Sequence, residues 1–421
     1  MAAKKAPVVS NASLALKNAR AAILKTTNHK PLGAEEKQWP HIPTGSIVID
    51  DLIGGSMGKD GKPVCPGIPR RRISEVFGPE SSGKTTLALS VVTNTQKAGG
   101  SVLYLDYEHA LHIGYAKALG VSFDENQLNL FTPDTLEEGF KMMLLGIMFG
   151  VDLIVVDSVA AMVPSGELAK DMSDPARVGA MSSLMSQHLP KFANWLATFP
   201  RVGGKEGPTD KTKPGTALLL LNQERATIAT GGGGYGTPDP NTSGGKALKF
   251  YASLRLRVQK IKTETIEQVD VFTKKKIKRP YGTMTLVKVI KDKLDGRQGH
   301  TGTIFIRYGQ GIDNYHSIIE SAVSNDLMKK EGSFYTLDNE RFRGRDQCRK
   351  YLIENPKKYA ELEKLVRRVI LESAKPILDS DVDPNTSVIN DIEDEFGPSE
   401  GISFDTLGSA LEEEVIEEVV E

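Results

Sequence analysis

A phosphate-binding loop is the clearest chemical signal in the sequence. The residues GPESSGKTT match the pattern G-x4-G-K-[S/T]. Its glycines let the backbone curl with N–H groups pointing at phosphate oxygens, and the helix expected to follow adds partial positive charge. In such loops the lysine reaches the β- and γ-phosphates, and the hydroxyl after it is a ligand of Mg²⁺. The predicted ATP contacts are Gly78, Pro79, Glu80, Ser81, Ser82, Gly83, Lys84, Thr85 and Thr86.

Two carboxylates that follow other apolar runs are candidates for metal binding and catalysis. The run DLIVVD ends at Asp157, where a carboxylate beside the loop would share Mg²⁺ with Thr85. Glu108 follows the run SVLYLD, on what we expect to be the same edge of a sheet. It is a candidate general base or water-orienting residue for hydrolysis. Its position alone fits equally well a glutamate favoured by a helix N-terminus.

The chain around these residues alternates short apolar runs with helical segments. Continuous apolar strands separated by helices indicate a mostly parallel sheet covered on both faces. From about Leu254 the runs LRLRVQKI, QVDVFT, GTMTLVKVIK and TGTIFIRY follow without helices, and they predict an antiparallel extension. The predicted fold class is therefore α/β. We expect strands at 73–77, 101–106, 152–157 and 216–222, and helices near 83–98, 109–119, 135–149 and 179–199.

The predicted domain organisation has four parts. Residues 1–43 hold an amphipathic helix at 10–26 and a proline-containing linker, and this helix either packs peripherally or docks on a neighbouring subunit. Residues 44–312 form the ATPase core. Residues 313–378 form a basic, helical C-terminal domain. Residues 379–421 form an acidic tail that we expect to be disordered.

The net charge of −1 hides a strong asymmetry. Residues 379–421 contain 15 acidic residues and neither Lys nor Arg, whereas residues 1–378 contain 53 basic and 39 acidic residues, a net charge of +14. Such an asymmetry favours a polyanion partner for the body of the chain. The tail then either competes with that partner or serves only as a solubilising segment.

Composition argues against several other classes. Cys65 and Cys348 are too few and too far apart for a disulfide framework or a metal cage, so a reducing compartment is the default. The longest apolar run, Met142 to Val151, falls short of the roughly 18 residues that cross a membrane. The N-terminus shows no apolar segment typical of a secretion signal. We therefore expect a cytoplasmic protein without a membrane partner.

Several blocks resemble, in order and spacing, the RecA family of homologous-recombination ATPases. These blocks are GPESSGKTTL, LDYEHAL, VVDSVAA, MSQ, NQ-x-R and SGGKALKFYASLRL, within roughly residues 44–375. The resemblance implies a DNA-dependent ATPase that uses ATP and Mg²⁺. It implies a homo-oligomeric helical filament on single-stranded DNA, which then pairs with homologous duplex DNA. A ring-shaped helicase or another motor on the same core is the alternative.

The same resemblance assigns roles around the nucleotide. Glu108 matches the catalytic glutamate, and Tyr115 matches the aromatic residue that stacks on adenine. Gln223 matches the residue that senses the γ-phosphate and relays it to a DNA-binding loop, which places it with Lys84 and Glu108 in catalysis. Lys291 and Lys293 match two lysines that reach the ATP of the adjacent subunit. Their spacing of two also fits solvent-facing positions on a strand.

Two loops and a helix start are the expected DNA contacts. The loop at about 166–178 precedes the helix that contains MSQ, and the loop at about 224–243 reads ERATIATGGGGYGTPDPNTS. The second loop is either a disordered surface loop or a segment that orders when backbone N–H groups meet phosphate. The expected DNA-binding residues are Arg177, Arg225, Ile228, Gly244, Gly245 and Lys246. Phe250 matches a subunit-interface residue, although an aromatic at helical spacing is more often part of a core.

Four departures from the family pattern indicate a divergent member. His112 stands where the family has an aspartate that contacts the base. Ser183 and Pro190 stand where arginines are usual, and Arg177 or Lys191 is a candidate replacement for the lost phosphate contacts. The polar segment 201–215 is a further surface loop.

Overall fold

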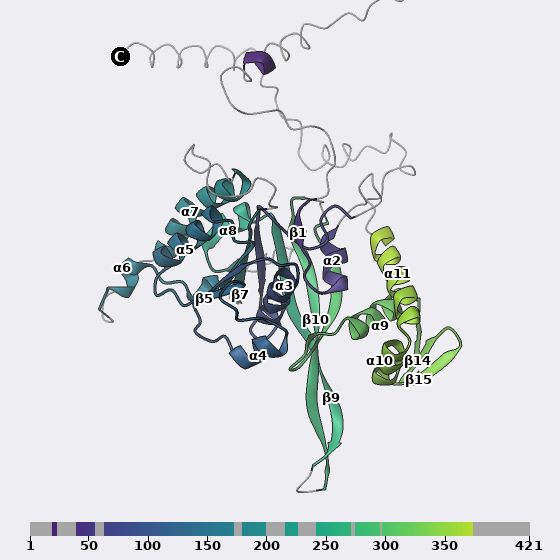
Figure 1. Cartoon of the computed structure of the whole chain (residues 1–421). Coiled ribbons are helices and arrows are strands. Elements are labelled where there is room, and N and C mark those ends of the chain that lie inside the picture. Colours follow the sequence, from purple (N-terminus) through teal and green to yellow (C-terminus); the bar gives the residue numbers. More distant parts are fainter. Residues whose placement is uncertain are drawn as a thin grey trace, which may run out of the picture. The chain divides into compact units, whose positions relative to one another are not determined.

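The computed structural model describes residues 19–22, 39–54, 63–171, 179–198, 215–225, 241–270, 274–294 and 297–373. Of the N-terminal helix expected at 10–26, it describes residues 19–22, which are helical. Residues 375–421 form a unit separate from residues 1–374 and lie outside the described ranges. The fold below is that of the first unit (Figure 1).

A ten-stranded sheet organises the described core, in the order β12-β11-β10-β9-β3-β7-β6-β4-β5, with β8 paired to β7. The strands β3, β4, β5, β6, β7 and β9 pair in parallel, and β9 to β12 pair antiparallel. The predicted α/β class, with a parallel core and an antiparallel extension, is thus confirmed. The strands are β3 (Ile73–Gly78), β4 (Val102–Asp106), β5 (Leu128–Phe131), β6 (Leu153–Asp157), β7 (Ala217–Arg225), β8 (Asn241–Thr242), β9 (Leu254–Val269), β10 (Lys276–Asp292), β11 (Thr301–Arg307) and β12 (Gly311–Ile312).

Helices cover both faces of this sheet (Figure 1). Alternate residues of each parallel strand enter different cores, so Val155 packs with one set of helices and Ile154 with the other. This two-sided burial explains why the strands read as continuous apolar runs. One face carries α2 (Ile47–Gly54), α3 (Lys84–Lys97) and α4 (Ile113–Ala118), and the other carries α5 (Leu136–Met148), α7 (Ala180–Thr198) and α8 (Gly245–Tyr251).

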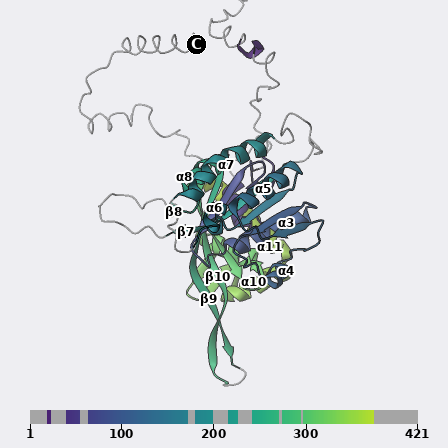
Figure 2. The same cartoon turned by 90° about the vertical axis from the view of Figure 1, so that its left-hand side faces the viewer.

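A long hairpin formed by β9 and β10 projects beyond the rest of the sheet (Figure 2). The QVDVFT run, which looked like a strand of its own in the sequence, begins inside β9, because that strand continues unbroken to Val269. Shifts of register between Pro280 and Gly282, between Met284 and Thr285, and between Val289 and Lys291 mark bulges along the ribbon.

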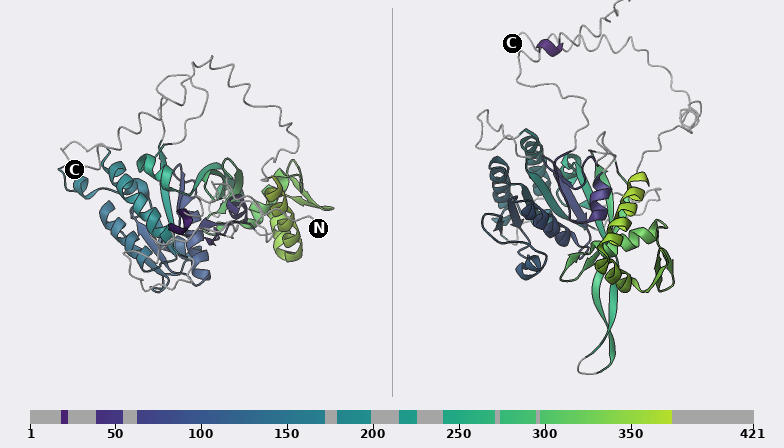
Figure 3. Two further views of the ribbon diagram at one scale, coloured as in Figure 1. Left: turned by 90° about the horizontal axis from the view of Figure 1, so that it is seen from above. Right: turned by 45° about the vertical axis from the view of Figure 1, so that its right-hand side comes forward.

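The C-terminal segment contains more than the helices expected from the sequence. A three-stranded sheet lies between α9 and α10 and shares their core through Tyr335, Leu337 and Phe342. Strands of three or four residues show too few periods of alternation to be recognised beside strong helices. Figure 3 shows this part from two further sides. Its elements are α9 (Asn314–Ser324), β13 (Lys329–Glu331), β14 (Phe334–Leu337), β15 (Glu340–Arg343), α10 (Arg345–Glu354) and α11 (Pro356–Ser373).

The ordered core begins earlier than residue 44. β1 (His41–Ile42) pairs with β2 (Ile68–Pro69), and Ile42 is buried in the core beneath α3. The indole N–H of Trp39 donates to the Arg70 carbonyl at 2.9 Å. The prolines at 40 and 43 do not break this short strand, because a two-residue edge strand has few ladder bonds to lose.

Candidate active site

The phosphate-binding loop joins β3 to α3 at the carboxyl edge of the parallel strands. Gly83 has a φ of 99° and Ser81 a φ of 56°, so the loop turns through left-handed conformations before α3 begins. A Cβ on Gly83 would lie 2.3 Å from the Ile306 side chain, and φ there is also unfavourable for other residues. The loop lines a pocket of about 670 Å³. All seven loop residues from Glu80 to Thr86 are among its lining.

The Lys84 side chain forms hydrogen bonds with backbone carbonyls of its own loop. Its ammonium group donates to the carbonyls of Gly78 at 3.1 Å and Pro79 at 2.7 Å. Burial lowers the pKa of Lys84, whereas the nearby Asp157 and Glu108 carboxylates act in the opposite direction. Phosphate oxygens could replace both carbonyls as hydrogen-bond acceptors of this ammonium group. A half-buried cation beside the loop also suits the negative charge of a phosphate.

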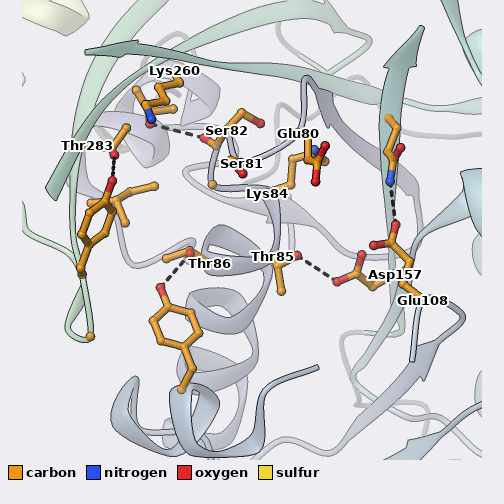
Figure 4. A pocket seen from close by; sticks show the side chains of 17 residues that line it. Glu80, Ser81, Ser82, Lys84, Thr85, Thr86, Glu108, Asp157, Lys260 and Thr283 are labelled. Carbon is orange, nitrogen blue, oxygen red and sulfur yellow. Dashed lines mark hydrogen bonds between the residues drawn. The ribbon is translucent and has the colours of Figure 1, made fainter. Parts of the chain in front are cut away.

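Thr85 and Asp157 meet across the pocket as the sequence predicted (Figure 4). The Thr85 hydroxyl donates to Asp157 Oδ2 at 3.0 Å, and the Tyr104 hydroxyl donates to the same oxygen at 2.8 Å. Burial raises the pKa of Asp157, and these two hydrogen bonds counteract the effect. One hydroxyl and one carboxylate beside a phosphate site fit Mg²⁺, which takes few protein ligands. Among the described residues, no cluster of three His, Cys, Asp or Glu side chains could hold a metal ion.

Glu108 lies beside this pair because β4 and β6 are neighbours in register, with Asp106 opposite Asp157. Its carboxylate oxygen Oε1 accepts hydrogen bonds from Gln223 Nε2 at 2.9 Å and from the Ser158 hydroxyl. Gln223 reaches it from the end of β7. The structure thus brings together two of the predicted residues, Glu108 and Gln223, which are 115 positions apart in the sequence. An oriented carboxylate at the pocket wall can position a water molecule and accept its proton.

Tyr115 lies on the other side of the pocket. Its hydroxyl shares a hydrogen bond of 2.8 Å with Thr86 Oγ1, and its backbone N–H donates to His112 Nδ1 at 2.9 Å. His112 is the N-cap of α4. The aromatic ring therefore borders the space next to the phosphate loop, where a nucleotide base would lie.

Lys291 and Lys293 do not line the pocket of their own chain. The ammonium group of Lys291 donates to the Phe250 carbonyl at 3.0 Å, and that of Lys293 donates to the same carbonyl at 2.9 Å. Burial, helped by the neighbouring Lys293, lowers the pKa of Lys291 to about 8. The two lysines thus cap the carboxyl end of α8 and are not simply solvent-facing residues of a strand.

The predicted DNA contacts are only partly covered by the described residues. Arg225 ends β7, but its side chain lies outside them, as do Arg177 and Ile228. Gly244 and Gly245 have φ values of 91° and 71° and precede the exposed Lys246. Phe250 is 67% exposed, which contradicts a core role and leaves a surface role open.

Two of the sequence features that indicated a divergent member have places in the fold. Ser183 and Pro190 both lie on α7, which continues through the proline. Lys191, a suggested replacement for a lost cation, is exposed on the same helix. Residues 201–214 of the polar segment lie outside the described ranges, as do residues 226–240 of the second DNA loop predicted at 224–243.

Several residues that line the pocket or hydrogen-bond to its carboxylates were missed from the sequence. Ser158 directly follows Asp157, so its place beside Glu108 was within reach of the strand-edge argument. Tyr104 faces Asp157 from the neighbouring strand β4, which the sequence did not pair with β6. The remaining residues line the pocket from the antiparallel extension. Their sequence gave no indication of a role at the site, because only the fold brings them to the phosphate-binding loop. They are Lys260, Thr283, Thr285, Ile306, Tyr308 and Gly309.

Comparison with known proteins identifies relatives over most of the chain. The family model of the RecA N-terminal domain matches residues 32–313, and that of the RecA C-terminal domain matches residues 316–371. Protein RecA of Pseudarthrobacter chlorophenolicus is 38% identical over 339 residues, 80% of this chain and 84% of the relative. Protein RecA of Mycolicibacterium smegmatis is 37% identical over 361 residues, 84% of this chain and 91% of the relative. Protein RecA of Borrelia hermsii is 38% identical over 333 residues.

Proposed function

We propose that the pocket at the β3–α3 loop is an ATP site, because this chain belongs to the RecA family of DNA-dependent ATPases that act in recombination and repair. The observation that carries the proposal is the convergence of Lys84, Thr85, Asp157 and Glu108 on one pocket. Phosphoryl transfer depends mainly on positioning and on charge stabilisation, and these four side chains supply both.

Each side chain has a separate role in this proposal. Lys84 exchanges its loop carbonyls for phosphate oxygens and stabilises charge on them. Thr85 and Asp157 hold Mg²⁺, which would neutralise phosphate charge when bound. Glu108 orients the attacking water and accepts its proton. Tyr115 packs against the base of the nucleotide.

Gln223 would connect this site to DNA. Its amide donates a hydrogen bond to Glu108 at 2.9 Å, and the predicted DNA loop at about 224–243 begins at the next residue. A γ-phosphate would compete with Glu108 for the Gln223 amide. That competition would change the conformation at the end of β7, where the predicted DNA loop begins. Arg225, Ile228, Gly244, Gly245 and Lys246 are the proposed contacts to the DNA backbone, together with Arg177 of the first loop.

The assembled state follows from the same assignment. The protein forms a homo-oligomeric filament on single-stranded DNA and then pairs it with homologous duplex DNA. Lys291 and Lys293 reach the ATP of the adjacent subunit, and the exposed Phe250 lies in that interface. Among the described residues, every helix is too short or too polar to cross a bilayer. We expect the protein to act in the cytoplasm, where ATP and DNA are available.

The test is ATP hydrolysis with and without single-stranded DNA. Lys84→Ala should abolish nucleotide binding and turnover. Glu108→Gln should keep ATP binding and lower the DNA-stimulated kcat by about 100-fold or more, because general-base catalysis typically contributes 10²–10⁴-fold.

Glu125→Gln is a matched control, because Glu125 is an exposed carboxylate that does not line this pocket. It should retain turnover within a few-fold of the unmodified protein. Normal turnover by Glu108→Gln would refute the catalytic assignment. Absence of stimulation by single-stranded DNA in the unmodified protein would refute the proposed coupling.

A further inference from the structure

The outer half of the β9–β10 hairpin has no part in the ATP site. We call residues 265–270 and 274–280 the distal arm. Glu264, just inside it, is tied to the rest of the molecule by Arg345 at 3.3 Å. Beyond that anchor the strands continue in register to the pair Val269 and Lys276. At about 3.4 Å per residue the arm extends about 20 Å past Glu264, and the views in Figures 1 and 2 show it standing clear of the helices.

The distal arm is basic, with five Lys or Arg side chains against the two carboxylates of Glu267 and Asp270. Five of the six residues 274–279 are Lys or Arg, and all five are exposed. Lys276 and Lys278 share one face of the ribbon, and Arg279 lies on the other, 4.0 Å from Asp270. Basic side chains therefore line both faces of a narrow projection. Like charges this close repel one another in the free protein, and a polyanion would relieve that repulsion.

The apolar residues of the arm do not form a protein-docking surface. Ile266 and Val269 are 42% and 59% exposed, but they lie three positions apart on one strand and so face opposite sides. Single exposed apolar residues are ordinary on protein surfaces, whereas docking sites need a continuous patch. The charge and not the apolar surface therefore indicates the partner.

We propose that the distal arm is a DNA-binding element that contacts the phosphates of duplex DNA from the major groove. A two-stranded β-ribbon has the width that this groove admits. Single-strand sites of the stacking type place successive bases on several aromatic side chains, whereas residues 259–280 contain one aromatic residue, Phe272. The inference deepens the proposed function by giving the incoming duplex a contact separate from the two DNA loops.

The arm is continuous with the nucleotide site. Lys260, Thr283 and Thr285, at the base of the same two strands, line the ATP pocket. The Thr285 hydroxyl donates to the Ser82 carbonyl of the phosphate loop at 3.4 Å. The same two strands therefore form the arm and part of the wall of the ATP pocket, so duplex DNA bound to the arm would contact strands that border the nucleotide.

The experiment compares duplex and single-strand affinity across a salt series, with a nonhydrolysable ATP analogue bound. The variant is Lys275→Ala/Lys276→Ala/Lys278→Ala. Lys274, whose φ of 54° is left-handed, is left unchanged so that the turn of the hairpin is the same in each point variant. Duplex affinity should fall about tenfold near 0.1 M salt, and the slope of log K against log salt should decrease by up to about 0.9 per lost phosphate contact. Affinity for single-stranded DNA should stay the same.

Three further proteins make the result specific. Lys97→Ala/Lys117→Ala/Lys141→Ala removes the same charge from exposed positions on α3, α4 and α5 and should leave the salt slope unchanged. Lys275→Arg/Lys276→Arg/Lys278→Arg should retain duplex binding. Replacement of Glu267–Lys278 by Asn-Gly, which closes a shortened hairpin with a two-residue turn, should lose as much duplex affinity as the alanine variant.

Some outcomes would overturn the inference. One is an unchanged duplex salt slope in both arm variants. Another is an equal loss for duplex and single-stranded DNA, or for the control triple, which would indicate a general charge effect. Altered self-assembly without DNA, at normal duplex affinity, would make the arm a subunit contact instead. DNA-stimulated ATP hydrolysis is measured separately, so a failure of the proposed function would be distinguishable from a failure of the arm.

Discussion

His112 stands where the resemblance to the family predicts an aspartate beside the nucleotide base. Its imidazole is the N-cap of α4, and Nδ1 accepts the Tyr115 N–H at 2.9 Å. An aspartate carboxylate would also cap a helix here. The departure therefore keeps the capping bond and removes a negative charge from the rim of the pocket. The role of His112 that the structure supports is to position Tyr115.

Removal of this cap should weaken nucleotide binding. We expect His112→Ala to raise the KM for ATP about fivefold and leave kcat unchanged, because a lost N-cap costs about 1 kcal/mol. His112→Asn, which retains a capping oxygen, should remain close to the unmodified protein. Steady-state kinetics of both variants would check this. A fall in kcat with an unchanged KM would indicate that His112 acts on the reaction itself.

At the scale of elements, a buried polar cluster joins the strands under the phosphate loop. Glu75 on β3 pairs with Arg255 on β9 at 2.6 Å and accepts a hydrogen bond from Asn222 on β7 at 2.9 Å. The same Asn222 amide donates to the Ser243 carbonyl at 2.8 Å. Asn222 directly precedes Gln223, and Ser243 is the last residue of the predicted second DNA loop. The cluster therefore connects β3, the strand that leads into the phosphate-binding loop, to both ends of the predicted second DNA loop.

Asn222→Ala should separate stability and coupling from nucleotide binding. It leaves buried acceptors on Glu75 and Ser243 without their donor, at a cost of about 1–3 kcal/mol in the free energy of unfolding. We expect ATP affinity to persist and the stimulation of hydrolysis by single-stranded DNA to fall several-fold. Urea unfolding and ATPase assays measure the two effects. Asn194→Ala, at an exposed position of α7, is the control; full stimulation in Asn222→Ala would contradict the link.

At the scale of the whole molecule, the assigned roles divide one ATP site between two subunits. Lys84 belongs to the subunit that holds the nucleotide, whereas Lys291 would act from its neighbour. Lys291→Ala also loses bonds to carbonyls of α8, so a loss of activity alone would not identify a role in trans. Mixing two inactive variants resolves this ambiguity.

We expect a 1:1 mixture of Lys84→Ala and Lys291→Ala to recover about a quarter of normal DNA-stimulated hydrolysis, because a random head-to-tail assembly creates that share of intact interfaces. Each variant alone should be inactive. The measurement is phosphate release at fixed total protein and varying ratio. A mixture as inactive as its components would exclude the role in trans, provided that both variants are folded by circular dichroism.

The charge asymmetry of the chain also belongs to this scale. The +14 body predicted a polyanion partner, and the family membership confirms a DNA-dependent activity. The distal arm shows one place where that charge is concentrated. The acidic segment 379–421 lies outside the described residues, and its competition with DNA stays a prediction.

Much of the core could be predicted from the sequence because its signals are local. The strands of the parallel sheet are buried on both faces, so they appear as apolar runs whatever their order. The phosphate loop needs its glycines and lysine next to one another in the chain. Asp157 and Glu108 follow directly from the rule that parallel strands present their carboxyl ends at one edge.

The short strands β13 to β15 and the unbroken length of β9 were not predicted, because their pairing depends on partners rather than on their own periodicity. The sequence by itself determined the fold class, the chemistry of the phosphate loop and the presence of a basic body. Only the tertiary structure decided that Ser158 and Gln223 share Glu108, that Lys291 caps α8 and that basic residues 274–279 form a projecting arm. Local periodicity and motif spacing are written along the chain, whereas cross-strand neighbours depend on strand order, which long-range packing determines.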